Sequence, residues 1–153
     1  MRTFTISVFL ISAIIIAGPA AREIEQTPRI KHADQQQFVV WDGQEYGPHK
    51  FVIVVGVFQN KLAYSSQDEE GRWTAHWGEK DYGPFDDLMV DGVYQSKLYF
   101  YYALNEDFYV QWGDKKRGPY DWVWGLHYDT NAGQAYYSMR HRQLSLEIHW
   151  DGN

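Results

Sequence analysis

Trp77–Pro84, WGEKDYGP, has two further copies in this chain at nearly one spacing. Residues 41–48 read WDGQEYGP, and residues 112–119 read WGDKKRGP. With a fourth tryptophan near the C-terminus, tryptophan recurs at intervals of 36, 35 and 38 residues. A fixed period of this length indicates a repeated structural unit. The structural repeat positions are Trp41, Gly47, Pro48, Trp77, Gly83, Pro84, Trp112, Gly118, Pro119 and Trp150.

A second motif has the same period. VFQNKLAY at residues 57–64 matches VYQSKLYF at residues 93–100, and a weaker third copy lies at residues 128–137. Because two independent motifs share one period, the repeat is not a chance similarity. It is the strongest signal in the sequence.

Each unit is predicted to consist of short strands. Aromatic residues make up 18% of the chain, and aromatic and β-branched side chains favour pleated sheet. Polar pairs such as Gln59-Asn60 and the glycine-bearing GEKD are typical of hairpin turns. Proline cannot donate to a strand ladder, so Gly-Pro belongs on an edge strand or at a strand end. We expect an all-β fold of about three tandem four-stranded antiparallel meanders, each of roughly 36 residues.

Alternation along the third strand of each unit assigns the repeat tryptophan to a face. Side chains two residues apart share a face of a strand, so Trp73, Ala75 and Trp77 lie together, while Thr74 and His76 lie opposite. The same pattern recurs before Trp112 and Trp150. We therefore predict that these tryptophans belong to the core rather than to a repeated ligand site.

The combined pattern, Trp-x-Gly-x-x-Tyr-Gly-Pro followed by Leu-Ala-Tyr, resembles the blade repeat of bacterial β-propellers of the TolB and WD40-like type. The resemblance runs from Phe38 to Asn153 and implies four-stranded blades. Closed propellers typically use 4–8 blades, so about three repeats imply either an open array or a six-unit ring completed by a homodimer. A threefold β-prism or β-trefoil is the alternative fold.

The N-terminus predicts export. Residues 1–21 have one basic residue, a long apolar run and small residues at the end, which is the order of a secretory signal peptide. An uncleaved anchor is the lesser alternative. Residues 22–36 are expected to be a polar linker or ordered tail, and residues 37–153 the β-repeat domain. The protein is thus expected to be secreted or periplasmic, with no stable membrane insertion after signal cleavage.

The charge and the motifs exclude several functions. The net charge is −6 and no Lys/Arg cluster offsets it, so nucleic acid is not an expected partner. The six histidines lack metal-ligand spacing, and no metal or cofactor is expected. No nucleophile motif or Ser/His/Asp arrangement is apparent, so the chain is not expected to be an enzyme. The weaker alternative is a glycoside hydrolase that uses turn carboxylates such as Asp86.

The least repeat-like stretch is residues 120–133, YDWVWGLHYDTNAG. Clustered aromatic residues with a few polar groups suit stacking on sugar rings or an interface hot spot. We therefore expect a non-catalytic module that binds a protein or another ligand, or alternatively a lectin-like protein that binds carbohydrate. The candidate binding residues are Trp122, Trp124, His127, Tyr128 and Asp129.

Overall fold

The computed structural model describes residues 27–151, and within that range every regular element is a β-strand. Fourteen strands form four antiparallel sheets in which consecutive strands are neighbours. We name them sheet A (β1–β3), sheet B (β4–β7), sheet C (β8–β11) and sheet D (β12–β14). The all-β prediction is confirmed for this part of the chain. The predicted signal peptide lies outside the described residues.

The strands are 5 to 8 residues long. Sheets A and B contain β1 (Arg29–Ala33), β2 (Gln36–Trp41), β3 (Gln44–His49), β4 (Phe51–Phe58), β5 (Lys61–Gln67), β6 (Trp73–Trp77) and β7 (Lys80–Phe85). Sheets C and D contain β8 (Asp87–Tyr94), β9 (Lys97–Leu104), β10 (Asp107–Trp112), β11 (Lys115–Tyr120), β12 (Trp122–Asp129), β13 (Gln134–His141) and β14 (Leu144–Trp150).

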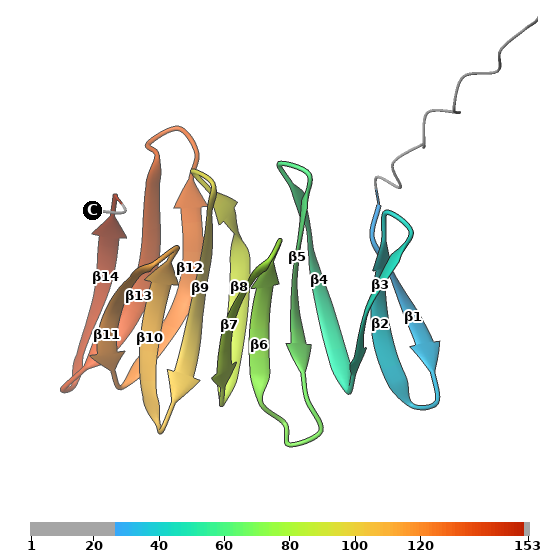
Figure 1. Ribbon diagram of the computed structural model, residues 1–153. Helices are drawn as coiled ribbons and strands as arrows, with labels where there is room; N and C mark the ends of the chain where they lie inside the picture. Colours follow the sequence, from blue (N-terminus) through green and yellow to red (C-terminus); the bar gives the residue numbers. More distant parts are fainter. Residues whose placement is uncertain (1–26, 152–153) are drawn as a thin grey trace, which may run out of the picture.

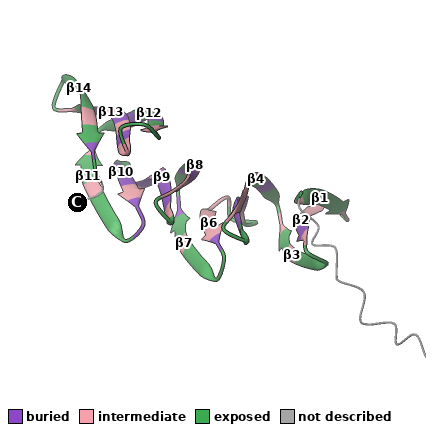
Figure 2. Cartoon of the chain, turned by 90° about the horizontal axis from the view of Figure 1, so that it is seen from above, coloured by how far each residue is buried: buried purple, intermediate pink, exposed green. Residues whose placement is uncertain are grey.

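The four sheets stand face to face in a row, from sheet A in blue to sheet D in red (Figure 1). Seen from above, the first strands β4, β8 and β12 run along one side of the row and the last strands β3, β7 and β11 along the other (Figure 2). Sheet A lacks the strand equivalent to β4, and sheet D lacks the strand equivalent to β7. No sheet closes on itself.

Two findings add to the predicted organisation. β1 lies inside residues 22–36, the segment expected to be a linker or ordered tail, and pairs with β2 from Arg29↔Val40 to Ala33↔Gln36. The chain therefore forms four sheets instead of about three units, because β1 to β3 make a sheet of their own. Among the described residues, no helix is long and apolar enough to cross a membrane.

Each Gly-Pro pair is a bulge on an edge strand. In sheet B, Trp73 pairs with Phe85 and Ala75 pairs with Tyr82, so Gly83 and Pro84 together stand opposite a single residue. A Cβ on Gly83 would lie 2.7 Å from the carbonyl oxygen of Trp73. Only glycine permits this approach, and proline is tolerated because the strand is an edge. The equivalent bulges are at Gly47-Pro48 and Gly118-Pro119.

The repeat tryptophans hold each sheet against the next. Trp77 is 8% exposed and packs with Leu98 and Phe100 of sheet C, and Trp112 is 1% exposed and packs against sheet D. Trp41 is half-buried in the cluster between sheets A and B. The predicted core placement of the tryptophans is confirmed for Trp77, Trp112 and Trp150, of which the last is 2% exposed.

The last tryptophan faces the other way. Trp150 pairs with Ala135 and packs back toward sheet C, with its ring 5.9 Å from that of Trp112 at an interplanar angle of 86°. The opposite face of sheet D instead carries polar groups, including Ser138 and Glu147. Because the final spacing is 38 residues, β14 is out of phase with the earlier third strands. Sheet D thus ends the array with an outer face that carries polar groups on β13 and β14 and the exposed Trp124 on β12.

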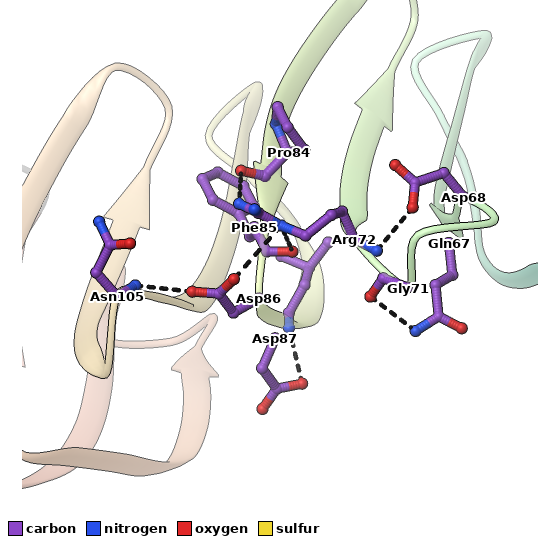
Figure 3. Close-up of polar contacts among 10 residues, drawn as sticks. Gln67, Asp68, Gly71, Arg72, Pro84, Phe85, Asp86, Asp87 and Asn105 are labelled. Carbon is purple, nitrogen blue, oxygen red and sulfur yellow. Dashed lines mark hydrogen bonds and ion pairs between the residues drawn. The ribbon is translucent and has the colours of Figure 1, made fainter.

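Arg72 joins sheet B to sheet C (Figure 3). Its guanidinium donates to the carbonyl oxygens of Phe85 and Pro84, both at 3.1 Å, and lies 3.4 Å from the Asp86 carboxylate. Asp86 also accepts a hydrogen bond from the backbone N–H of Asn105 at 2.7 Å. The carboxylate that the sequence suggested for glycoside hydrolysis therefore caps a turn at the junction of two sheets.

We predict that Gly83→Ala lowers the free energy of unfolding by about 3 kcal/mol, because φ is +137° and the new Cβ meets the Trp73 carbonyl. Urea denaturation measures this loss. Gly43→Ala is the control: its φ is +72°, with nothing within 4 Å of the added Cβ, so the loss is about 1 kcal/mol. Equal losses in the two variants would contradict a bulge that requires glycine.

Candidate functional site

The interface between sheets A and B is hollowed at both ends, and the first hollow is lined by aromatic rings. It is a groove of about 640 Å³ between the β2–β3 turn of sheet A and the β4–β5 and β6–β7 turns of sheet B. This volume lies in the usual range of small-molecule sites. We call it the aromatic groove; its lining includes Trp41, Tyr46, Lys61, Tyr64, Trp77 and Glu79.

Two indole groups of the aromatic groove lack hydrogen-bond partners. The Nε1 atoms of Trp41 and Trp77 are buried and have no acceptor among the described residues. By contrast, Nε1 of Trp112, the equivalent residue of sheet C, donates to the carbonyl oxygen of Tyr94 at 3.1 Å. A buried donor without an acceptor is costly, and the two tryptophans leave one such donor at the A–B interface, in Trp41, and one at the B–C interface, in Trp77.

Charged and polar side chains accompany these rings. The Lys61 amine lies 5.2 Å from the centre of the Trp77 ring, within cation–π range. The Tyr46 hydroxyl donates to Gln44 at 2.9 Å. Burial, reinforced by the charge of Asp81, raises the pKa of Tyr64 to about 12, so this phenol is neutral at physiological pH. The groove thus combines apolar faces with hydrogen-bonding groups of both kinds.

At the other end of the same interface, three strands of sheet B bring a serine, a histidine and an aspartate into line. Ser66 on β5 lies 2.8 Å from Nε2 of His76 on β6, measured from Oγ. Nδ1 of the same ring lies 2.7 Å from Oδ1 of Asp81 on β7. Ser66 is 5% exposed, and the side chains of His76 and Asp81 are 12% and 68% exposed. The sequence analysis did not identify this arrangement.

These three residues line a cleft of about 440 Å³, which we call the polar cleft. His49, at the end of β3, also lines it, and its buried Nε2 has no partner in the part of the chain that the structure describes. The His76 ring stacks on Tyr64, 4.2 Å between centroids at 15°. Tyr64 therefore lies between the aromatic groove and the polar cleft.

Burial lowers the pKa of both histidines. For His49, desolvation is the largest cause and the neighbouring His76 lowers the pKa further. For His76, desolvation outweighs the hydrogen bond and charge of Asp81, which raise the pKa. Both rings are therefore held in the neutral form. A neutral His76 whose Nδ1–H donates to Asp81 leaves Nε2 free to accept the Ser66 hydroxyl proton.

The candidate residues of the sequence analysis lie on sheet D, away from both hollows. Trp122 and Trp124 are 47% and 40% exposed, and His127 is exposed, opposite Tyr136 in the strand pairing. Tyr128 instead stacks on Tyr94 at 4.1 Å in the interface between sheets C and D.

Asp129 has a turn-forming role, because its carboxylate accepts backbone hydrogen bonds from Asn131 and Ala132, which lower its pKa. The structure thus leaves Trp122, Trp124 and His127 exposed, while Tyr128 and Asp129 serve packing and a turn. That these five residues bind a ligand stays a prediction.

A comparison of the repeats would have located the polar cleft. At the repeat spacing, Ser66, His76 and Asp81 correspond to Tyr102, Gln111 and Lys116 of the next unit. Because all three positions hold different residues in the next unit, the repeated fold does not require Ser66, His76 or Asp81. The sequence analysis instead considered one long irregular stretch, residues 120–133, and did not compare single polar positions between the copies.

No protein-family model, curated protein or solved structure matches this chain. Within residues 27–151, no group of three or more His, Asp or Glu side chains is arranged to hold a metal ion. The site therefore has to be interpreted from its own geometry.

The lowered histidine pKa values predict acid-sensitive stability. A group whose pKa is lower in the folded state binds fewer protons than in the unfolded chain, so its contribution is present above about pH 6.5 and is lost as pH falls. We expect urea denaturation to show a falling free energy of unfolding from pH 7.5 to 5. His49→Gln should reduce this slope.

The His49→Gln variant measured at pH 8 supplies the control, since at that pH only the packing change contributes. If the variant and the wild type lose the same free energy between pH 8 and 5, His49 does not contribute to the dependence.

Proposed function

We propose that this chain is an exported β-repeat protein, secreted or periplasmic, that acts as a ligand-binding module. The aromatic groove is the proposed binding site, and carbohydrate is the proposed ligand class. The observation that carries the proposal is that the half-buried rings of Trp41 and Tyr46 line one groove together with the charged side chains of Lys61 and Glu79.

The chemistry of the groove supports a sugar. Aromatic faces stack on the apolar faces of sugar rings, while hydroxyl groups need donors and acceptors close by. Tyr46 and Trp41 supply half-buried rings, and Lys61 and Glu79 supply a donor and an acceptor.

The exposed tryptophans of sheet D support a second candidate function, protein interaction. Trp122 and Trp124 are large, exposed residues on an edge strand at the end of the row. Exposed aromatic residues of this kind are typical of interface hot spots. In this candidate the outer face of sheet D contacts a protein partner.

We also propose that the blade-like units remain an open array with capped ends rather than half of a six-unit ring. Trp150 turns back toward sheet C, so the third strand of sheet D offers no repeat tryptophan to a further sheet. The outer face of sheet A carries an ion pair between Lys31 and Glu45 at 2.8 Å. Polar end faces of this kind are usual in capped repeat arrays.

Light scattering tests the open array. The full chain has a mass of 18.0 kDa, and we expect the mass of one chain, less any cleaved signal, at micromolar concentration. A stable mass twice as large would contradict the capped array and favour the homodimeric ring.

A glycan array followed by isothermal titration with the best-bound sugar tests the binding site. We expect Trp41→Ala to raise the dissociation constant roughly tenfold, because a stacking surface is lost. Lys61→Gln should weaken binding as well. A matched control is Lys97→Gln, since Lys97 holds the equivalent position over Trp112 at 5.8 Å but lies outside the groove.

Two outcomes would redirect the proposal. Binding lost in Trp124→Ala but kept in Trp41→Ala would move the sugar site to sheet D. A folded protein that binds no sugar on the array would favour the protein-interaction function.

A further inference from the structure

The polar cleft contains the three groups that acyl transfer requires, in the order that the chemistry needs them. A nucleophilic hydroxyl has to contact the basic nitrogen of an imidazole, and the other nitrogen has to be held by a carboxylate. Ser66, His76 and Asp81 meet this requirement at 2.8 and 2.7 Å, through the correct ring nitrogens. All three side chains lie on the face of sheet B that is directed toward sheet A.

The strand register explains this alignment. Tyr64, His76 and Asp81 are directly paired across β5, β6 and β7, while Ser66 lies two residues further along β5 on the same face. The Ser66 hydroxyl therefore contacts the His76 imidazole on the side opposite to the Asp81 carboxylate. Side chains on adjacent strands are held more rigidly than on loops, which favours a defined geometry.

We propose that Ser66, His76 and Asp81 form a site for acyl transfer, with Ser66 as nucleophile and a small carboxylic ester as substrate. The proposal goes beyond ligand binding in the aromatic groove and does not depend on it. It also departs from the expectation of a non-catalytic chain, which rested on the absence of a recognisable motif in the sequence.

The reaction proceeds in two steps that balance. Ser66 Oγ attacks the ester carbonyl carbon as its proton passes to Nε2 of His76, and the alcohol then leaves with that proton, so that an acyl-serine forms. A water molecule next attacks the acyl carbon while His76 accepts its proton. Collapse of the second intermediate returns the proton to Ser66 and releases the carboxylic acid.

His49 is placed to stabilise the developing oxyanion. It lines the polar cleft from the opposing sheet, and its ring centroid lies 5.9 Å from that of His76. Its buried Nε2 is without a partner among the described residues, so an N–H there is available to a negatively charged oxygen. A donor directed at such an oxygen in a buried site makes a large contribution to rate.

The surroundings of the polar cleft indicate the substrate class. Its volume of about 440 Å³ admits a small acyl group. The loop at its rim carries Asp68, Glu69 and Glu70, whose negative charges disfavour an anionic substrate. A neutral or cationic ester of a short-chain acid is therefore the expected substrate.

Asp81 acts as a positioning residue, because it contacts His76 and not the substrate. Its carboxylate raises the pKa of His76 through a hydrogen bond and through its charge. The titratable or charged side chains that surround His76 in the cleft are His49, Lys50, Tyr64, Asp68, Glu69, Glu70 and Asp81.

A fluorophosphonate probe tests the nucleophile. Attack by an activated serine displaces fluoride from phosphorus and leaves a stable adduct, which peptide mass spectrometry locates in the wild-type protein without any variant. We expect one adduct, on Ser66, and we expect slow turnover of p-nitrophenyl acetate. Ser66→Ala should abolish both signals, and His76→Gln should lower the labelling rate by about 100-fold.

Ser65→Ala is the matched control, because Ser65 is also buried, at 3% exposed, but points to the opposite face of sheet B. It should label at the wild-type rate. Asp81→Asn should slow labelling and move the acid limb of the pH–rate profile to lower pH, since loss of the carboxylate lowers the pKa of His76. A purely structural role for Asp81 would not move that limb.

Folded wild-type protein that acquires no adduct on Ser66 would overturn the proposal, and the three side chains would then be a hydrogen-bonded network that satisfies a buried histidine. Labelling of His76→Gln at the wild-type rate would overturn it as well. Sugar binding in the aromatic groove is measured separately, so failure of one proposal leaves the other standing.

Discussion

The fold depends on one repeated contact, the burial of a third-strand tryptophan against the following sheet. A two-faced sheet of three or four short strands cannot bury enough surface alone, so each sheet needs a neighbour. Trp77 and Trp112 provide this contact, and the Gly-Pro bulge before each crossover sends the chain to the next sheet. When the phase of the tryptophan changes, as at Trp150, the stacking ends.

Because the tryptophan contact holds neighbouring sheets together, the side chains beside it can differ from one interface to the next. Between sheets B and C the space beside the tryptophan is filled by rings: Phe85 stacks on Tyr102 at 4.0 Å, and Tyr102 on Tyr109 at 5.2 Å. Between sheets A and B the position of Tyr102 is occupied by Ser66. The smaller polar residue leaves a cleft where the next interface has a stack of aromatic side chains.

Period and alternation were enough to predict the all-β class, the hairpin turns and the edge position of Gly-Pro. They were not enough to find β1, because Arg29–Ala33 is mostly exposed and lacks an apolar rhythm. They also did not reveal the polar cleft. Irregular residues such as Trp122 and Tyr128 can be recognised along the sequence itself. The alignment of Ser66, His76 and Asp81, by contrast, exists only across three paired strands.

The two hollows of the A–B interface share a wall, and this has a physical consequence. Tyr64 lines the aromatic groove and stacks on His76 of the polar cleft. A ligand that shifts the Tyr64 ring would therefore change the packing of the imidazole, because stacked rings in a buried site move together. The A–B interface also contains the unpartnered donors of Trp41 and His49, and we propose that the repeat has been adapted there for a role beyond holding the fold together.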